Sequence, residues 1–116
     1  MANRNLQKIS QEEIRDYAQH IGETFFPDKV ILFGSYANGD ADKNSDVDLF
    51  VIMDFSGRAP QQAYEIRKAI PKSFPLDLIV RRPQEVEQRL EMGDLFIRDV
   101  LSNGKILYEK DRTRVA

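Results

Sequence analysis

The chain has 116 residues, of which 41% are hydrophobic and 31% charged, and its net charge is −2 at pH 7. These values predict one globular domain over residues 1–116, and they exclude a disordered chain and a molecule-wide positive field that would attract nucleic acid. Cysteine is absent, which excludes disulfides, thiolate nucleophiles and cysteine-based zinc sites.

The first half of the chain predicts two helices that alternate with two strands. Ser10 and Glu13 form a capping-box pattern at the start of a helix, and Pro27 follows its expected end. A run of apolar residues then ends at Gly34, as expected for a short strand. In chain order we expect a helix from the Ser10 cap to about residue 25, a strand over 29–33, one helical turn over 35–38 and a strand over 46–53.

The second half predicts three helices and two strands. Pro60 suits the first turn of a helix, where its missing N–H is not needed, and Gly93 separates two further helices. We expect helices over residues 60–70, 83–91 and 94–102, with strands over 76–80 and 105–108. Because helices alternate with strands and no repeat or linker interrupts them, the chain is predicted to form one α/β (α+β) domain.

The stretch GSYANGDADKNSDVDLFV, residues 34–51, contains parts of several motifs. Gly34 and Gly39 have the spacing of a phosphate-binding P-loop, but an Asp-Ala pair stands where Lys and Ser or Thr are required. The acidic residues resemble the start of a calcium loop, but valine and methionine replace its required glycine and glutamate. Both motifs are therefore disfavoured, and the chemistry has to be inferred from individual positions.

Asp46 and Asp48 are two residues apart on the expected second strand. Alternate residues of a strand share a face, which separates the two carboxylates by about 6.6 Å along the strand. That spacing can bracket two magnesium ions, which in two-metal phosphoryl-transfer sites lie about 3.5–4 Å apart. The alternative is a solvated strand end with no ligand.

Two further features favour a nucleotide site. Gly34 and Ser35 follow an apolar strand and open a helical turn, where backbone N–H groups favour an anion; the alternative is an ordinary helix cap. Asp77 lies within the apolar run 75–80, where a buried charge needs a partner or a metal; the alternative is an edge strand on which Asp77 faces water.

Gly34-Ser35, Gly39 and the run Ser45-Asp46-Val47-Asp48-Leu49 together resemble the G-S-x(9–13)-D-x-D signature of the DNA-polymerase-β-like nucleotidyltransferase superfamily. The short chain and the third aspartate, Asp77, resemble its minimal nucleotidyltransferase (MNT) branch. This resemblance implies a small mixed β-sheet flanked by helices. It also implies an enzyme that uses ATP and two Mg²⁺ ions.

The resemblance also assigns roles to individual residues. Asp46 and Asp48 would ligate the two Mg²⁺ ions, and Asp77 would join them as metal ligand and catalytic residue. Gly34 and Ser35 would hold the phosphates of the nucleotide, with Ser45 as a further nucleotide-binding residue. An acceptor hydroxyl would then attack the α-phosphate and release pyrophosphate.

One position departs from the family pattern. Members often have arginine where Asn38 stands, and Asn38 has no positive charge to offer the phosphates. We consider Lys43, Arg81 and Arg82 as substitutes. Arg81 and Arg82 have two readings, a substrate clamp or a solvated turn.

The resemblance further implies a protein acceptor. Proteins of this kind are commonly antitoxins paired with HEPN-domain toxins, and some transfer AMP to a toxin tyrosine. The expected docking surfaces are the helices after Asp77. The last of them carries more apolar residues than one face needs: Leu95, Phe96, Ile97, Val100 and Leu101. The alternative is that all of them pack into the core.

Two other functions stay open. One is an antitoxin-like binding module that neutralises its partner by occupancy. For the enzyme and for this module alike, the partner expectation includes a homo- or hetero-oligomer. The other function is transfer to a small molecule or an RNA end, although nucleic acid is not the expected partner. Because the sequence has no signal-peptide core and no apolar run of membrane-spanning length, we expect a cytoplasmic protein with no membrane partner.

Overall fold

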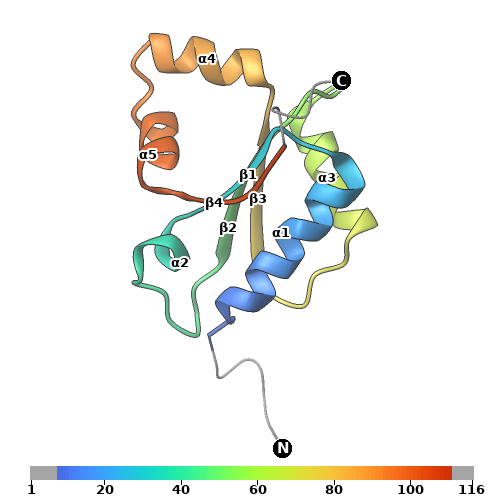
Figure 1. Cartoon of the computed structure of the whole chain (residues 1–116), viewed down its shortest axis with the longest axis vertical. Helices are drawn as coiled ribbons and strands as arrows, with labels where there is room; N and C mark the ends of the chain where they lie inside the picture. Colours follow the sequence, from blue (N-terminus) through green and yellow to red (C-terminus); the bar gives the residue numbers. More distant parts are fainter. Residues whose placement is uncertain (1–7, 111–116) are drawn as a thin grey trace, which may run out of the picture.

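A four-stranded mixed β-sheet forms the centre of the computed structural model, which describes residues 8–110 (Figure 1). The strand order is β3-β2-β1-β4. β1 (Lys29–Phe33) pairs antiparallel with both β2 (Val47–Ile52) and β4 (Lys105–Glu109), whereas β2 pairs in parallel with β3 (Leu76–Arg81). The end of β1 therefore lies beside the beginnings of β2 and β3.

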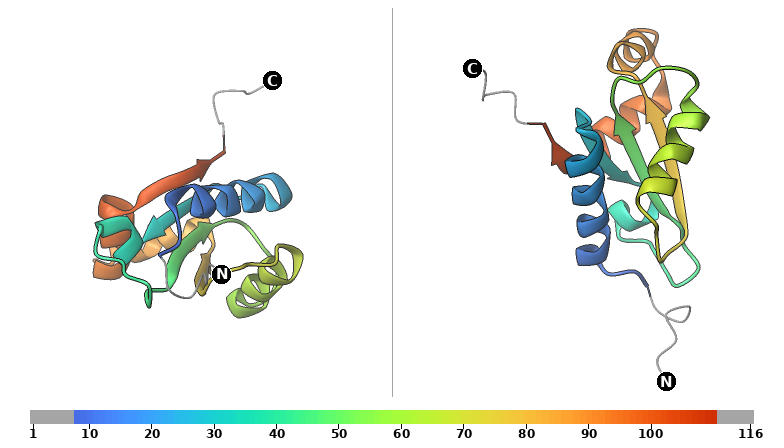
Figure 2. Two further views of the ribbon diagram at one scale, coloured as in Figure 1. Left: turned by 90° about the horizontal axis from the view of Figure 1, so that it is seen from below. Right: turned by 90° about the vertical axis from the view of Figure 1, so that its right-hand side faces the viewer.

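Helices cover both faces of this sheet (Figures 1 and 2). α1 (Gln11–Phe25) and α3 (Ala59–Ala69) lie on one face, and α4 (Pro83–Glu91) and α5 (Leu95–Asn103) lie on the other. The short α2 (Ser35–Asn38) follows β1 directly. This arrangement confirms the α/β (α+β) fold class with a small mixed sheet flanked by helices. Within residues 8–110, no helix is long and apolar enough to cross a membrane.

The first helix forms as its cap predicted. The Ser10 hydroxyl accepts a hydrogen bond from the Glu13 N–H at 3.0 Å, which satisfies one of the free donors at the helix start. The expected apolar face of α1 is buried against the sheet: Ile14, Tyr17, Ala18 and Ile21. The N-terminal part of α1 thereby comes to lie near α2, which becomes important for the candidate site.

The sheet separates two hydrophobic clusters, because side chains on a strand alternate between its faces. Val47, Leu49 and Val51 of β2 pack with α1 and α3, as the sequence predicted. Phe50 and Ile52, on the other face of β2, are buried with residues of α4 and α5. Asp48 points to this second face, but it lies near the start of β2, before Phe50, which is the first residue of β2 buried under α4 and α5.

Candidate active site

The expected carboxylates meet at one end of the sheet, where β1 finishes and β2 and β3 begin. Asp48 is the direct register partner of Asp77 on β3 and of Phe33 on β1. Neighbouring strands lie about 4.8 Å apart, and register partners extend their side chains from the same face. Asp46 immediately precedes β2, so the expected strand start was one residue early. Strand pairing thus brings together residues 29 positions apart.

Gly34 brings the backbone of the β1–α2 turn against the Asp48 carboxylate. Its backbone angles are φ 76° and ψ −154°, a combination that essentially only glycine adopts. A Cβ atom at this position would overlap the Asp48 carboxylate oxygen. Glycine is therefore required both by the turn and by the close approach of the carboxylate.

The surroundings of Asp48 disfavour its charge. Partial burial, followed by repulsion from Asp77 and Asp46, raises its pKa from 3.8 to about 6. The Phe33 ring, on the register partner of Asp48, packs edge-on against Phe50 with the ring centroids 6.4 Å apart. A cation at this point would relieve the repulsion, and oxygen ligands of this type suit magnesium.

The structure corrects the expectation that Asp77 lies in a buried strand. β3 is an edge strand and Asp77 is exposed. Leu76, Leu78 and Val80 pack into the first cluster, and on the Asp77 face Ile79 packs, partly buried, against the second. The place of Asp77 beside Asp48 comes from register. Within residues 8–110, no three carboxylate, histidine or cysteine side chains are gathered closely enough to hold a metal as they stand. The three aspartates fit magnesium in ligand type, and metal binding would require their side chains to reorient.

Ser35 and Ser45 lie in the segment between β1 and β2, at the same end of the sheet as the aspartates. Ser35 is the first residue of α2, directly after Gly34. The Ser45 hydroxyl accepts a hydrogen bond from the Asp42 N–H at 2.9 Å and lies 3.3 Å from the Asp42 carboxylate. Ser45 therefore closes the turn before β2, and its contact with a nucleotide stays a prediction.

Comparison with known proteins agrees with this geometry. A family model described as Polymerase beta, Nucleotidyltransferase matches residues 12–113. The chain belongs to this family. The resemblance seen in the sequence is thereby confirmed, and the protein is a nucleotidyltransferase.

Individual relatives extend this assignment. A Methanocaldococcus jannaschii protein named "Putative protein adenylyltransferase MJ1305" is 32% identical over 119 aligned residues, covering 96% of this chain and 77% of the relative. A second protein of that organism, "Putative protein adenylyltransferase MJ0141", is 38% identical over 53 residues, covering 46% of this chain and 54% of the relative. A crystal structure of a "putative nucleotidyltransferase" from Sulfolobus solfataricus has a TM-score of 0.60 and 16% identity, covering 87% of this chain and 81% of that one. The last likeness shows the shared fold.

The hydrogen bonds of Arg82 disfavour the clamp interpretation for that residue, whereas Arg81 lines one cavity with Asp77 and its role stays a prediction. Both lie at the opposite end of β3 from Asp77. Arg82 donates hydrogen bonds to the carbonyl oxygens of Phe55 at 3.1 Å and Gly57 at 2.6 Å, so it supports the loop after β2. The Arg81 Nε atom instead lies 3.8 Å from a carboxylate oxygen of Glu85 on α4.

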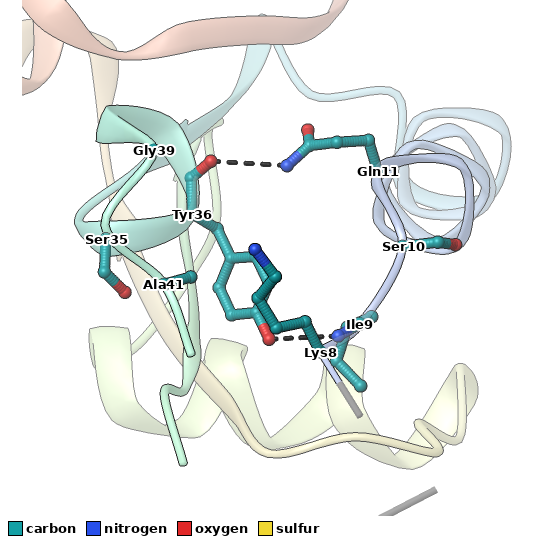
Figure 3. A pocket seen from close by; sticks show the side chains of 8 residues that line it. All are labelled: Lys8, Ile9, Ser10, Gln11, Ser35, Tyr36, Gly39 and Ala41. Carbon is teal, nitrogen blue, oxygen red and sulfur yellow. Dashed lines mark hydrogen bonds between the residues drawn. The ribbon is translucent and has the colours of Figure 1, made fainter. Parts of the chain in front are cut away.

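Sequence reasoning missed a cation that the fold of the nucleotidyltransferase brings close to Ser35. A cavity of about 350 Å³ opens between α2 and the start of α1, and Lys8 and Ser35 both line it (Figure 3). The two residues are 27 positions apart and no local motif joins them. The only indication of this cation in the sequence was a basic residue two positions before the Ser10 helix cap.

Exposed apolar side chains occur where α4 ends and α5 begins, on the side of the sheet that carries Asp48. Met92 and Leu95 are 84% and 75% exposed, and Phe96 is partly exposed. The Phe96 ring packs edge-on against Phe33, with centroids 5.5 Å apart, and Phe33 is the register partner of Asp48. Ile97 and Val100 are buried, so only part of the apolar surface expected on α5 is exposed, and docking of a partner there stays a prediction.

Proposed function

We propose that this nucleotidyltransferase transfers AMP from ATP to a hydroxyl group of a partner protein in a Mg²⁺-dependent reaction. The observation that carries the proposal is the meeting of Asp48 and Asp77 beside Gly34, with like-charge repulsion that a cation would relieve. The relatives named as protein adenylyltransferases favour a protein acceptor.

In this proposal, the aspartates bind the metal ions and the Gly34–Ser35 turn binds the nucleotide. Asp46 and Asp48 would hold two Mg²⁺ ions, with Asp77 as a ligand of the second. When bound, these ions lower the pKa of the acceptor hydroxyl and offset negative charge on the attacking and leaving oxygens. Gly34 and Ser35 would hold the β- and γ-phosphates, since the lack of a side chain at Gly34 lets the backbone come close.

The reaction balances without an external oxidant or reductant. A bond forms between the acceptor oxygen and the α-phosphorus, and the bond from the α-phosphorus to the oxygen bridging the β-phosphate breaks. Pyrophosphate leaves with the electron pair of that bond. Asp77 would accept the proton of the acceptor hydroxyl, because it is exposed on the edge strand β3 and is the register partner of Asp48.

The acceptor protein would dock on the exposed apolar residues of the α4–α5 region. Met92, Leu95 and Phe96 form this surface, and Phe96 connects it to Asp48 through Phe33. A protein seated there would present a hydroxyl at the carboxylates. By its resemblance to MNT proteins, the chain would act in this way as an antitoxin that modifies a HEPN-domain toxin, with both proteins in the cytoplasm.

A second candidate is a binding module that neutralises the same partner by occupancy. It is favoured by two observations: Asn38 carries no charge, and the three aspartates are not arranged to hold a metal as they stand. The exposed apolar residues of α5 fit both candidates, so only a measurement of chemistry separates them.

Transfer of a labelled α-phosphate distinguishes these functions. The protein is incubated with Mg²⁺, ATP labelled at the α-phosphate and the product of the neighbouring gene, which we expect to be a HEPN-type protein. We expect label on the partner, lost when Mg²⁺ is removed and in Asp46→Ala and Asp48→Ala. Co-purification of the two proteins without any transfer would instead establish the occupancy module.

A further inference from the structure

The turn formed by residues 34–39, Gly-Ser-Tyr-Ala-Asn-Gly, carries no charged side chain. A fully ionised nucleoside triphosphate and the three aspartates together carry more negative charge than the two proposed magnesium ions would offset. On one side of this turn lie the aspartates, which attract metal and repel phosphate. A cation for the terminal phosphates must therefore come from another segment of the chain.

The cavity between α2 and the start of α1 contains such a cation. Its α2 wall includes Ser35 and Gly39, and its opposite wall includes Lys8. Within the part of the chain that the structure describes, Lys8 is the only charged residue among those lining the cavity. In Figure 3 the Lys8 side chain extends from the α1 side toward α2.

Hydrogen bonds hold the two walls of this cavity together. The N–H of Ile9, next to Lys8, donates to the Tyr36 hydroxyl at 3.0 Å. The Gln11 side-chain amide donates to the Tyr36 carbonyl at 3.3 Å (Figure 3). Tyr36 itself is buried, so it anchors the segment that carries Lys8 to the phosphate-side turn.

The Lys8 ammonium is available for a ligand. Lys8 is exposed, and no acceptor among residues 8–110 forms an ion pair or hydrogen bond with it. The other lysine of this region, Lys43, lies on the exposed turn between Asp42 and Ser45 and does not line the cavity. Lys8 is therefore the cation that the fold directs toward the same opening as Ser35.

We propose that Lys8 binds the terminal phosphates of the nucleoside triphosphate, which extend from the aspartates over Ser35 into this cavity. The inference rests on the proposed function, because it assigns the tail of the same substrate. Lys8 is a binding residue and takes no part in the bond changes at the α-phosphorus.

The test measures the affinity for a nucleotide that cannot be turned over. The full chain is titrated with α,β-methylene-ATP and Mg²⁺, and Lys8→Ala is expected to weaken binding about tenfold, the effect of one charge-assisted contact. Lys8→Arg is expected to restore affinity to within about threefold, because it keeps the charge. The matched control is Lys29→Ala, at the opposite end of β1, which should bind normally.

Three outcomes would overturn the inference. One is unchanged affinity in Lys8→Ala, and another is a loss in Lys8→Arg equal to that in Lys8→Ala. The third is an equal loss of affinity for AMP, which has no terminal phosphates. Catalysis separates this inference from the proposed function: Lys8→Ala should raise the KM for ATP and leave kcat within about twofold. If the unmodified protein binds no nucleotide, both the inference and the proposed function are wrong.

Discussion

Replacing Asp48 by Asn should make the metal-free protein more stable at neutral pH. The pKa of Asp48 is raised from 3.8 to about 6, first by partial burial and then by the charges of Asp77 and Asp46. This difference corresponds to about 3 kcal/mol against the ionised folded state. Because the side chain is partly exposed, solvent screening reduces the effect to about 1–2 kcal/mol.

The sign of the pH dependence follows from proton binding. An acid whose pKa is raised by folding binds more protons in the folded state, so stability falls as pH rises from about 4 to 6. The penalty is complete at pH 7.5. Asp48→Asn should therefore raise Tm by about 3–10 °C at pH 7.5 in the absence of metal, and by about half as much at pH 5.

The assay is thermal unfolding with a chelator or with Mg²⁺ at both pH values. Asp54→Asn is the control, because Asp54 is an exposed aspartate beyond the other end of β2. Its Tm should stay within about 1 °C of the unmodified protein, as expected for an ordinary surface position. Magnesium should stabilise the unmodified protein more than Asp48→Asn. A lower Tm for Asp48→Asn with chelator at pH 7.5, or a gain that is the same at both pH values, would refute the reasoning.

Three other substitutions separate the site, the docking surface and the fold. Gly34→Ala should lower the free energy of unfolding by about 3 kcal/mol or more and abolish nucleotide binding. Gly39→Ala, also at positive φ but with open space around it, should lower the free energy of unfolding by about 1 kcal/mol. Equal losses for the two variants in denaturant unfolding would contradict the overlap between a Cβ at position 34 and the Asp48 carboxylate. Leu95→Glu should leave Tm within about 2 °C, since the residue is 75% exposed, and should weaken binding of the acceptor protein in a pull-down; unchanged capture would remove α5 as the docking surface. Tyr17→Phe removes a buried 2.8 Å hydrogen bond to the Ile70 carbonyl and should cost about 1 kcal/mol without changing the KM for ATP.

Local structure was largely predictable from the sequence. The strand Lys29–Phe33 and the helical turn Ser35–Asn38 occur as expected, because residues that stop strands and helices stand at their ends. The alternation of Val47, Leu49 and Val51 also predicted their common burial. Such features depend on neighbours in the chain, which a sequence displays directly.

The assembly of the site was less predictable because it depends on pairing between distant segments. Nothing local to Asp77 reveals that β3 is an edge strand or that Asp77 pairs in register with Asp48. The same holds for Lys8, which lines a cavity with Ser35 only because the start of α1 lies near α2. The position of Arg82 was ambiguous for the same reason, since its two hydrogen bonds go to a loop about 25 residues earlier.

The most direct test of the aspartate site is the fate of the two ends of ATP in a single reaction with the partner protein. With ATP labelled at the α-phosphate, we expect one adenylyl group on a partner hydroxyl by mass spectrometry for each pyrophosphate released, and neither product with Asp77→Asn. A phosphoryl group on the partner in place of an adenylyl group, or equal adenylylation by Asp77→Asn and the unmodified protein, would contradict the assignment.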